Sequence, residues 1–183
     1  MNRAGPWRQH CPASWPGWAK KWAKTRGSLT RKLVSTGGRF EVEPVRQGLQ
    51  ALTGRDAWHL DLAGRPKVQA RLVRLRLNGV PVVLAKTVVQ VKGVRNDWPF
   101  WRGLGRRSLG TALFSDPMVQ RGPLYFARLP ARQAWIKALA LPDVCPVSGW
   151  YVRCARYLRK PGATPMWVFE VFVPALNEVN QEK

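Results

Sequence analysis

The stretch QARLVRLRLNGVPVVLAKTVVQ, residues 69–90, carries the clearest structural signal in the chain. Two runs rich in valine and leucine flank Asn78-Gly79, a dipeptide typical of the two-residue turn of a β-hairpin. In the first run, alternate side chains share a face, and Arg71 falls in line with three aliphatic residues. We therefore predict a β-hairpin in which Arg71 lies inside or at the rim of an apolar face.

A second apolar run near the C-terminus, PMWVFEVFVPAL at 165–176, contains a single carboxylate, Glu170. Alternation makes both faces of this predicted strand apolar, so both faces are expected to be buried. A lone buried charge is costly, and Glu170 should therefore have a partner. Two interpretations stay open. One is a structural ion pair with Arg71 or a position at the sheet rim; the other is a pocket where Arg71 holds a carboxylate and Glu170 donates a proton.

Lys86 is a third charge on an apolar row, because it alternates with valine and leucine in the second run of the hairpin. Taken alone, such a lysine is more often an edge residue or one whose ammonium reaches solvent along its aliphatic stem. Its place on the strand next to Arg71 nevertheless predicts a basic pocket suited to a dianion.

The rest of the chain indicates a single α+β domain built on an antiparallel sheet, because hairpins alternate with short helical segments. We expect an irregular N-terminal arm at 1–16, the domain at 17–177 and a polar tail at 178–183. Ser28 and Ser108 are placed to cap helices, and no firm prediction is made for 52–67. Helices are predicted at Gly17–Lys24, Ser28–Ser35, within 96–117 (two) and within 130–141, and further strands at 39–48, 123–129, 148–158 and 165–173.

Charge is the strongest compositional feature, with 31 Lys and Arg against 10 Asp and Glu and a formal net charge of +21. Such a chain can bind nucleic acid or attract a small anion. The basic residues are scattered along the whole length and match no nucleic-acid-binding module, so no nucleic-acid partner is predicted. The sequence has no membrane-spanning run and no secretory signal. We expect a cytoplasmic monomer without a membrane partner.

Metal and cofactor sites are not predicted. The 3 cysteines and 2 histidines lie at spacings that match no metal motif. The glycine-containing segment at 103–110 lacks the pattern of a phosphate-binding loop. The cysteines are expected to be reduced thiols.

Four segments in order carry a family resemblance. The chain resembles the chorismate pyruvate-lyases, which make 4-hydroxybenzoate for ubiquinone biosynthesis, over residues 15–177. The resemblance implies a cofactor-independent carbon–oxygen lyase that converts chorismate to 4-hydroxybenzoate and pyruvate. It also implies a compact antiparallel sheet with helical flaps over a buried site. The segments are GSLTRKL (27–33), RLVRLRLNGVPVVLAKTVV (71–89), LGRRSLGTALF (104–114) and MWVFEVFVPAL (166–176).

The resemblance also implies a role for each candidate residue. Arg71 would bind the aromatic carboxylate, and Glu170 would face the other end of the ring as general acid or as a positioning group. The backbone amides of Leu109 and Leu29 would help to hold the carboxylate. Lys86 would hold the enolpyruvyl carboxylate, at a position where relatives can carry arginine; lysine keeps the charge without the bidentate geometry.

Two other functions compete with the lyase. Related folds serve as effector-binding domains of transcription regulators, so a non-catalytic sensor of small aromatic acids is the alternative. Such regulators carry a separate DNA-binding module, and we expect no room for one beside the domain at 17–177. A basic nucleic-acid-binding protein is the third hypothesis. Turnover of chorismate separates the lyase from the other two, and strong salt-dependent binding to arbitrary duplexes without turnover would favour the third.

Overall fold

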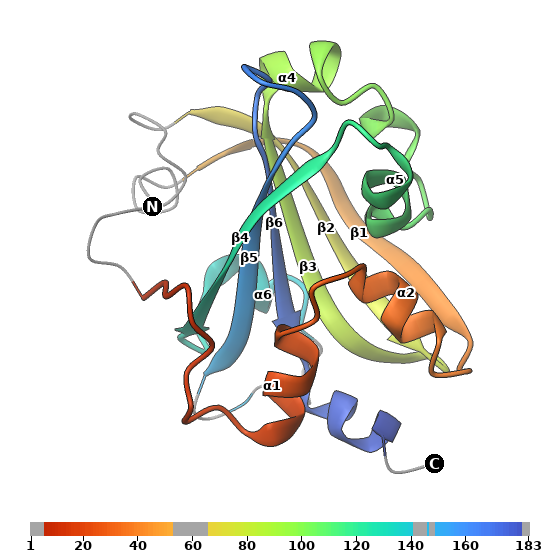
Figure 1. The fold of residues 1–183 in the computed structure, drawn as a ribbon, viewed down its shortest axis with the longest axis vertical. Helices are drawn as coiled ribbons and strands as arrows, with labels where there is room; N and C mark the ends of the chain where they lie inside the picture. The colour runs from red at the N-terminus through yellow and green to blue at the C-terminus, as the bar shows by residue number, and fades with distance from the viewer. Residues whose placement is uncertain (1–5, 53–65, 141–145, 147–148, 181–183) are drawn as a thin grey trace.

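The computed structural model describes residues 6–52, 66–140, 146 and 149–180. Six antiparallel strands form one sheet in the order β1-β2-β3-β6-β5-β4 (Figure 1). This confirms the predicted α+β class. The strands are β1 (Phe40–Ala51), β2 (Lys67–Leu77), β3 (Val80–Gln90), β4 (Gln120–Leu129), β5 (Trp150–Leu158) and β6 (Met166–Phe172), and the helices are α1 (Gly17–Ala23), α2 (Leu29–Val34), α4 (Val91–Asn96), α5 (Leu109–Ser115) and α6 (Ala134–Lys137), with 3-10 helices η1 (Trp101–Gly103) and η2 (Pro174–Asn180).

The predicted hairpin is present as β2 and β3. Asn78 and Gly79 adopt φ angles of 49° and 80°, the left-handed pair that a tight hairpin turn requires. The Asn78 side chain also accepts a hydrogen bond of 2.8 Å from the backbone amide of Arg39, which joins the turn to the start of β1.

A β-bulge interrupts this hairpin close to its turn. Arg76 pairs with Pro81, but the next pair along is Leu75 with Val83, so β3 has one extra residue at Val82. Proline lacks an amide donor and is tolerated at such irregularities. Beyond the bulge the register is shifted by one residue, and a shift of one moves every later side chain to the opposite face.

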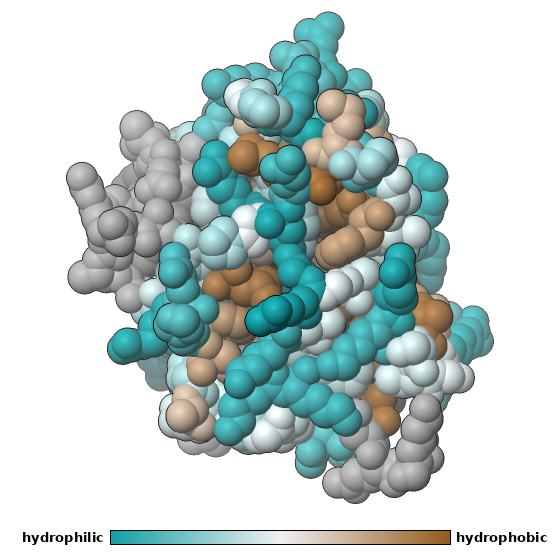
Figure 2. Space-filling view, viewed as in Figure 1, coloured by the Kyte–Doolittle hydropathy of each residue, from teal (hydrophilic) through white to brown (hydrophobic). Residues whose placement is uncertain are grey.

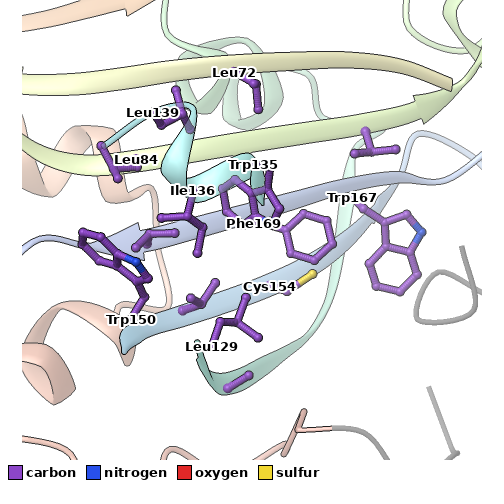
Figure 3. Close-up of a cluster of buried hydrophobic side chains, with 14 of the residues drawn as sticks. Leu72, Leu84, Leu129, Trp135, Ile136, Leu139, Trp150, Cys154, Trp167 and Phe169 are labelled. Carbon is purple, nitrogen blue, oxygen red and sulfur yellow. The ribbon is translucent and has the colours of Figure 1, made fainter. Parts of the chain in front are cut away.

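The register of the paired strands determines which residues share each face of the sheet. The face that we call the pocket face carries Arg71, Val73, Thr87, Arg153 and Glu170, as the cross-strand pairs show. Helices α2 and α5 lie on this side of the sheet (Figure 1). On the opposite face, the rear face, a buried apolar cluster joins the strands to α6; Figure 3 shows Leu72, Leu84, Trp135, Ile136 and Phe169 within it.

Short helices follow the predicted capping pattern. The Ser28 hydroxyl accepts from the Arg31 amide at 3.2 Å, and the Ser108 hydroxyl accepts from the Thr111 amide at 3.4 Å. Each serine thus satisfies one orphan amide of the helix that it begins. Helix α4 was not predicted, because it follows β3 directly and its first turn lacks a side-chain cap.

The terminal segments differ in part from expectation. The arm is irregular within its described part, but Arg8 bridges Phe126 on β4 and Trp15 is buried with its ring 4.9 Å from that of Tyr151. At the other end η2 extends across the predicted boundary between domain and tail. His59, Cys145 and most of 52–67 lie outside the described residues. No helix in the part of the chain that the structure describes is long and apolar enough to cross a membrane.

The hairpin turn generates a stability prediction. Replacing Gly79 with alanine forces a side chain into a left-handed conformation, so the free energy of unfolding should fall by about 1 kcal/mol. Gly17→Ala is the matched control, because Gly17 is the first residue of α1 and a Cβ there meets nothing within 4 Å. Urea unfolding of both variants measures the difference, and equal stability of the two would contradict the assigned turn.

Candidate active site

A small cavity lies on the pocket face between two apolar clusters and beneath α2 and α5. Its enclosed volume is about 50 Å³. Most of the lining is apolar, and its polar groups include two arginines and a carboxylate. The lining comprises Leu29, Thr30, Val42, Arg71, Val73, Leu75, Ala85, Thr87, Ser108, Leu109, Gly110, Leu113, Phe114, Arg153, Tyr157, Val168 and Glu170.

Arg71 forms one pole of the cavity and is only 2% exposed. Its guanidinium donates to the side-chain oxygen of Gln47 at 2.8 Å and to the carbonyls of Gly105 at 2.9 Å and Arg107 at 3.3 Å. Gln47 is itself held by a 3.0 Å bond to the Trp101 carbonyl. Burial lowers the pKa of Arg71 from its ordinary value, but a guanidinium remains charged in proteins. A fixed cation therefore faces the cavity.

Glu170 and Arg153 form the other pole. They are direct cross-strand partners on β6 and β5, and the Arg153 Nε atom donates to the Glu170 carboxylate. The Arg153 Nη1 atom donates to the carbonyls of Ala23 at 3.2 Å and Thr25 at 2.9 Å, in and just after α1. Tyr157 lies on the same face of β5, four residues after Arg153. Burial, and next the charge of Glu170, raise its pKa to about 12.

The two helices above the cavity contact each other directly. The hydroxyls of Thr30 on α2 and Ser108, the cap of α5, lie 2.7 Å apart in a hydrogen bond. Gly110 makes this approach possible, since a Cβ at that position would come 2.7 Å from the Thr30 hydroxyl oxygen. We call α2 and α5, together with their capping serines, the flaps.

Comparison with known proteins gives the family. A sequence model of the chorismate lyase family matches residues 2–181. The chain belongs to the chorismate lyase family. A Cupriavidus pinatubonensis protein named probable chorismate pyruvate-lyase is 40% identical over 177 residues, covering 93% of this chain and 89% of that protein. A Nitrosomonas eutropha protein of the same name is 35% identical over 169 residues, covering 92% and 93%. The predicted resemblance and the lyase class are thereby confirmed.

Solved structures show the same fold in proteins of another kind. The effector domain of PhnF from Mycobacterium smegmatis superposes with a TM-score of 0.51 at 15% identity, covering 81% of this chain and 90% of that chain. The C-terminal domain of the histidine utilization repressor from Pseudomonas syringae gives 0.52 at 14% identity, covering 75% and 93%. At such identities the likeness concerns the fold alone.

The structure brings four of the five predicted site residues together, because Arg71, Glu170, Leu29 and Leu109 all line the cavity. Lys86 does not belong with them. It pairs with Leu72 and Phe169 on the rear face, with Nζ 5.6 Å from the Trp135 ring centroid. The prediction that it shares a pocket with Arg71 is wrong. A regular two-residue hairpin would pair these two residues, but the bulge at Val82 pairs Arg71 with Thr87 instead.

Arg153 is the site residue that sequence reasoning missed. The expected ion pair of Glu170 exists, but its partner is Arg153 and not Arg71. A signal was available in the turn between the last two strands. A hairpin centred on Pro161-Gly162, where Gly162 has a φ of 75°, places Arg153 opposite Glu170.

The described residues do not provide a cluster of metal ligands. Within 6–52, 66–140, 146 and 149–180, no group of three or more His, Cys, Asp and Glu side chains is placed to hold a metal ion. Cys11 and Cys154 are free thiols. Burial, and next the charge of Glu170, raise the pKa of Cys154 well above its ordinary value, so this thiol stays protonated.

The contact between the flaps is testable through stability. Gly110→Ala should force α5 away from α2 and lower the free energy of unfolding by about 1–3 kcal/mol, since overpacking costs that much. Removing the obstructing hydroxyl in a Gly110→Ala, Thr30→Ala double variant should recover part of the loss. Gly27→Ala is the control, because a Cβ there meets nothing within 4 Å. Equal stability of Gly110→Ala and the native chain in urea unfolding would rule out this contact as a packing constraint.

Proposed function

We propose that this protein is a chorismate pyruvate-lyase that converts chorismate to 4-hydroxybenzoate and pyruvate, an early step of ubiquinone biosynthesis. The observation that carries the proposal is a buried apolar cavity with the Arg71 guanidinium at one pole and the Glu170 carboxylate at the other. Membership of the chorismate lyase family supports the same reaction.

The spacing of the poles suits a para-substituted ring. Arg71 pairs with Thr87, and Glu170 pairs with Ala85, so the two residues lie two strands and two residues apart. With strands about 4.8 Å apart and a rise of about 3.3 Å per residue, their Cα atoms are roughly 12 Å apart. A six-membered ring bearing a carboxylate and a para hydroxyl would lie between the two side chains along this line.

The proposed reaction needs no oxidant and no cofactor. The bond between ring carbon 3 and the ether oxygen breaks, the hydrogen on ring carbon 4 leaves, and the ring becomes aromatic. The departing enolpyruvate gains one proton at its methylene carbon and becomes pyruvate. Atoms and charges balance, because one dianion yields two monoanions. The protein's part is to bind the dianion, exclude water and orient the breaking bond.

Individual residues would divide this work. Arg71 would bind the ring carboxylate with the backbone amides of Leu29 and Leu109, each the first residue of a flap helix. Glu170 would orient the ring hydroxyl or donate a proton. The high net charge of +21 would attract a dianion to the surface, where hydrophilic side chains cover much of the face in Figure 2.

The cavity is smaller than its proposed ligand. Its volume is about 50 Å³, whereas a cavity of roughly 150 Å³ holds benzene in a well-studied engineered protein. An aromatic acid therefore fits only when the flaps or lining side chains move outward.

A monomeric state and a cytoplasmic location stay predictions.

Mixing the purified protein with chorismate is the direct test. The ultraviolet spectrum should show 4-hydroxybenzoate forming well above the spontaneous background. Arg71→Gln should lower kcat/KM by about 100-fold or more, because it removes a buried charged donor. Arg76→Gln is the matched control on the same strand; its guanidinium contacts the partly exposed Glu43. Binding of 4-hydroxybenzoate without turnover would instead indicate a sensor.

The role of Glu170 has its own test. If Glu170 supplies a proton, Glu170→Gln should lower kcat by about 100-fold and abolish one limb of the pH–rate profile. If Glu170 only orients the ring, the variant should keep the pH–rate profile, and its kcat should fall by a smaller factor. Unchanged kcat together with an unchanged profile would exclude the role of proton donor.

A further inference from the structure

Chorismate carries two carboxylates, and the proposed function leaves one of them without a partner. Arg71 accounts for the ring carboxylate. Lys86, expected to hold the enolpyruvyl carboxylate, lies on the rear face of the sheet. The second carboxylate therefore needs a different cation in the cavity. Among the lining residues, all of which are described, the arginines Arg71 and Arg153 are the only basic side chains.

We propose that Arg153 binds the enolpyruvyl carboxylate of the substrate. This inference rests on the proposed lyase function and assigns its second charge-recognition group. Arg153 is 2% exposed and lines the cavity beside Glu170, at the pole where the resemblance places the far end of the ring. The enolpyruvyl ether leaves the ring at the carbon next to the one that carries the hydroxyl, so both substituents lie at this pole.

The hydrogen bonds of Arg153 leave the required donors. A guanidinium has five N–H donors. The Nε atom is used by Glu170, and Nη1 is used by the carbonyls of Ala23 and Thr25. No hydrogen bond to any described residue involves Nη2. The three existing contacts fix the plane of the group, so that Nη2 is held in place before substrate arrives.

Local charge favours a second anion at this pole. Glu170 is balanced by Arg153, but Arg153 also has Lys32 as a neighbour, with Nζ bonded to the Lys21 carbonyl at 2.7 Å and to the Thr25 hydroxyl at 3.0 Å. Burial, and next the charges of Lys21 and Arg153, lower the pKa of Lys32. Arg153 and Lys32 thus face the single carboxylate of Glu170, and a substrate carboxylate would reduce the excess of positive charge around Arg153.

The same contacts make Arg153 a tether for the first flap. The carbonyls that it binds, Ala23 and Thr25, belong to the segment that leads into the Ser28 cap of α2. A carboxylate bound to Nη2 would therefore be joined through one side chain to Glu170 and to this segment. Departure of pyruvate would remove that connection.

Two ligands that differ in the second carboxylate test the assignment. Arg153→Met should raise the KM for chorismate, or its Kd where turnover is absent, by about ten-fold or more, since a hydrogen bond to a charged group contributes about 1.5–3 kcal/mol. The Kd for 4-hydroxybenzoate, which lacks the enolpyruvyl group, should change by a much smaller factor. Arg153→Lys should restore part of the chorismate affinity, because it retains the charge.

The affinities for chorismate and 4-hydroxybenzoate are also measured with and without Arg153→Met in a Glu170→Gln background. In this background no unpaired carboxylate is left behind when Arg153 is removed. Lys86→Met is the matched control and should leave the ratio of the two affinities unchanged. If Arg153→Met weakens both ligands by the same factor, Arg153 is a structural residue and the proposal is wrong. The proposal would also be overturned if Lys86→Met changed the ratio of the chorismate and 4-hydroxybenzoate affinities and Arg153→Met did not. A protein that binds chorismate with the expected ratio but does not turn it over would contradict the proposed function and not this assignment.

Discussion

Two guanidinium groups are buried on one face of a β-sheet, and the rest of the structure depends on how their donors are satisfied. Burying a charge without partners is prohibitive. Arg71 is satisfied by Gln47 and by carbonyls that precede the flap helix α5, and Arg153 by Glu170 and by carbonyls that precede the flap helix α2. The bonds that allow these cations to be buried are thus the bonds that hold the flaps over the cavity. The same hydrogen bonds therefore serve both the fold and the site.

The two poles resemble each other in construction. At each, a strand arginine donates to the backbone just before a serine cap, and a leucine begins the short helix that follows. The two helices then meet through the hydroxyls of Thr30 and Ser108. An apolar wall between charged poles suits a flat ring with polar substituents at its ends, because apolar contact supplies burial while the poles determine orientation. Inside a protein each charged hydrogen bond is electrostatically stronger than in water.

Much of the fold and of the site was predictable because local signals agreed with the final structure. The turn at Asn78-Gly79, the capping serines and the alternation of Arg71 with aliphatic residues depend on neighbours within a few positions. The pairing of the partly buried Glu170 with a cation followed from the cost of an isolated charge. Helix α4 was missed because it starts at the residue directly after β3, so no turn residues mark the boundary.

The sequence by itself determined the α+β class, the hairpins and the presence of buried charges that require partners, since these follow from periodicity, turn chemistry and solvation. Tertiary structure decided which charges meet. One extra residue at Val82 shifts the register of β3, and this turns Lys86 to the rear face. Pairing of the last two strands brings Arg153 to Glu170. Alternation within one strand predicts which of its residues share a face. Which residues of the neighbouring strand lie on that same face depends on the pairing register, and a single bulge changes the register.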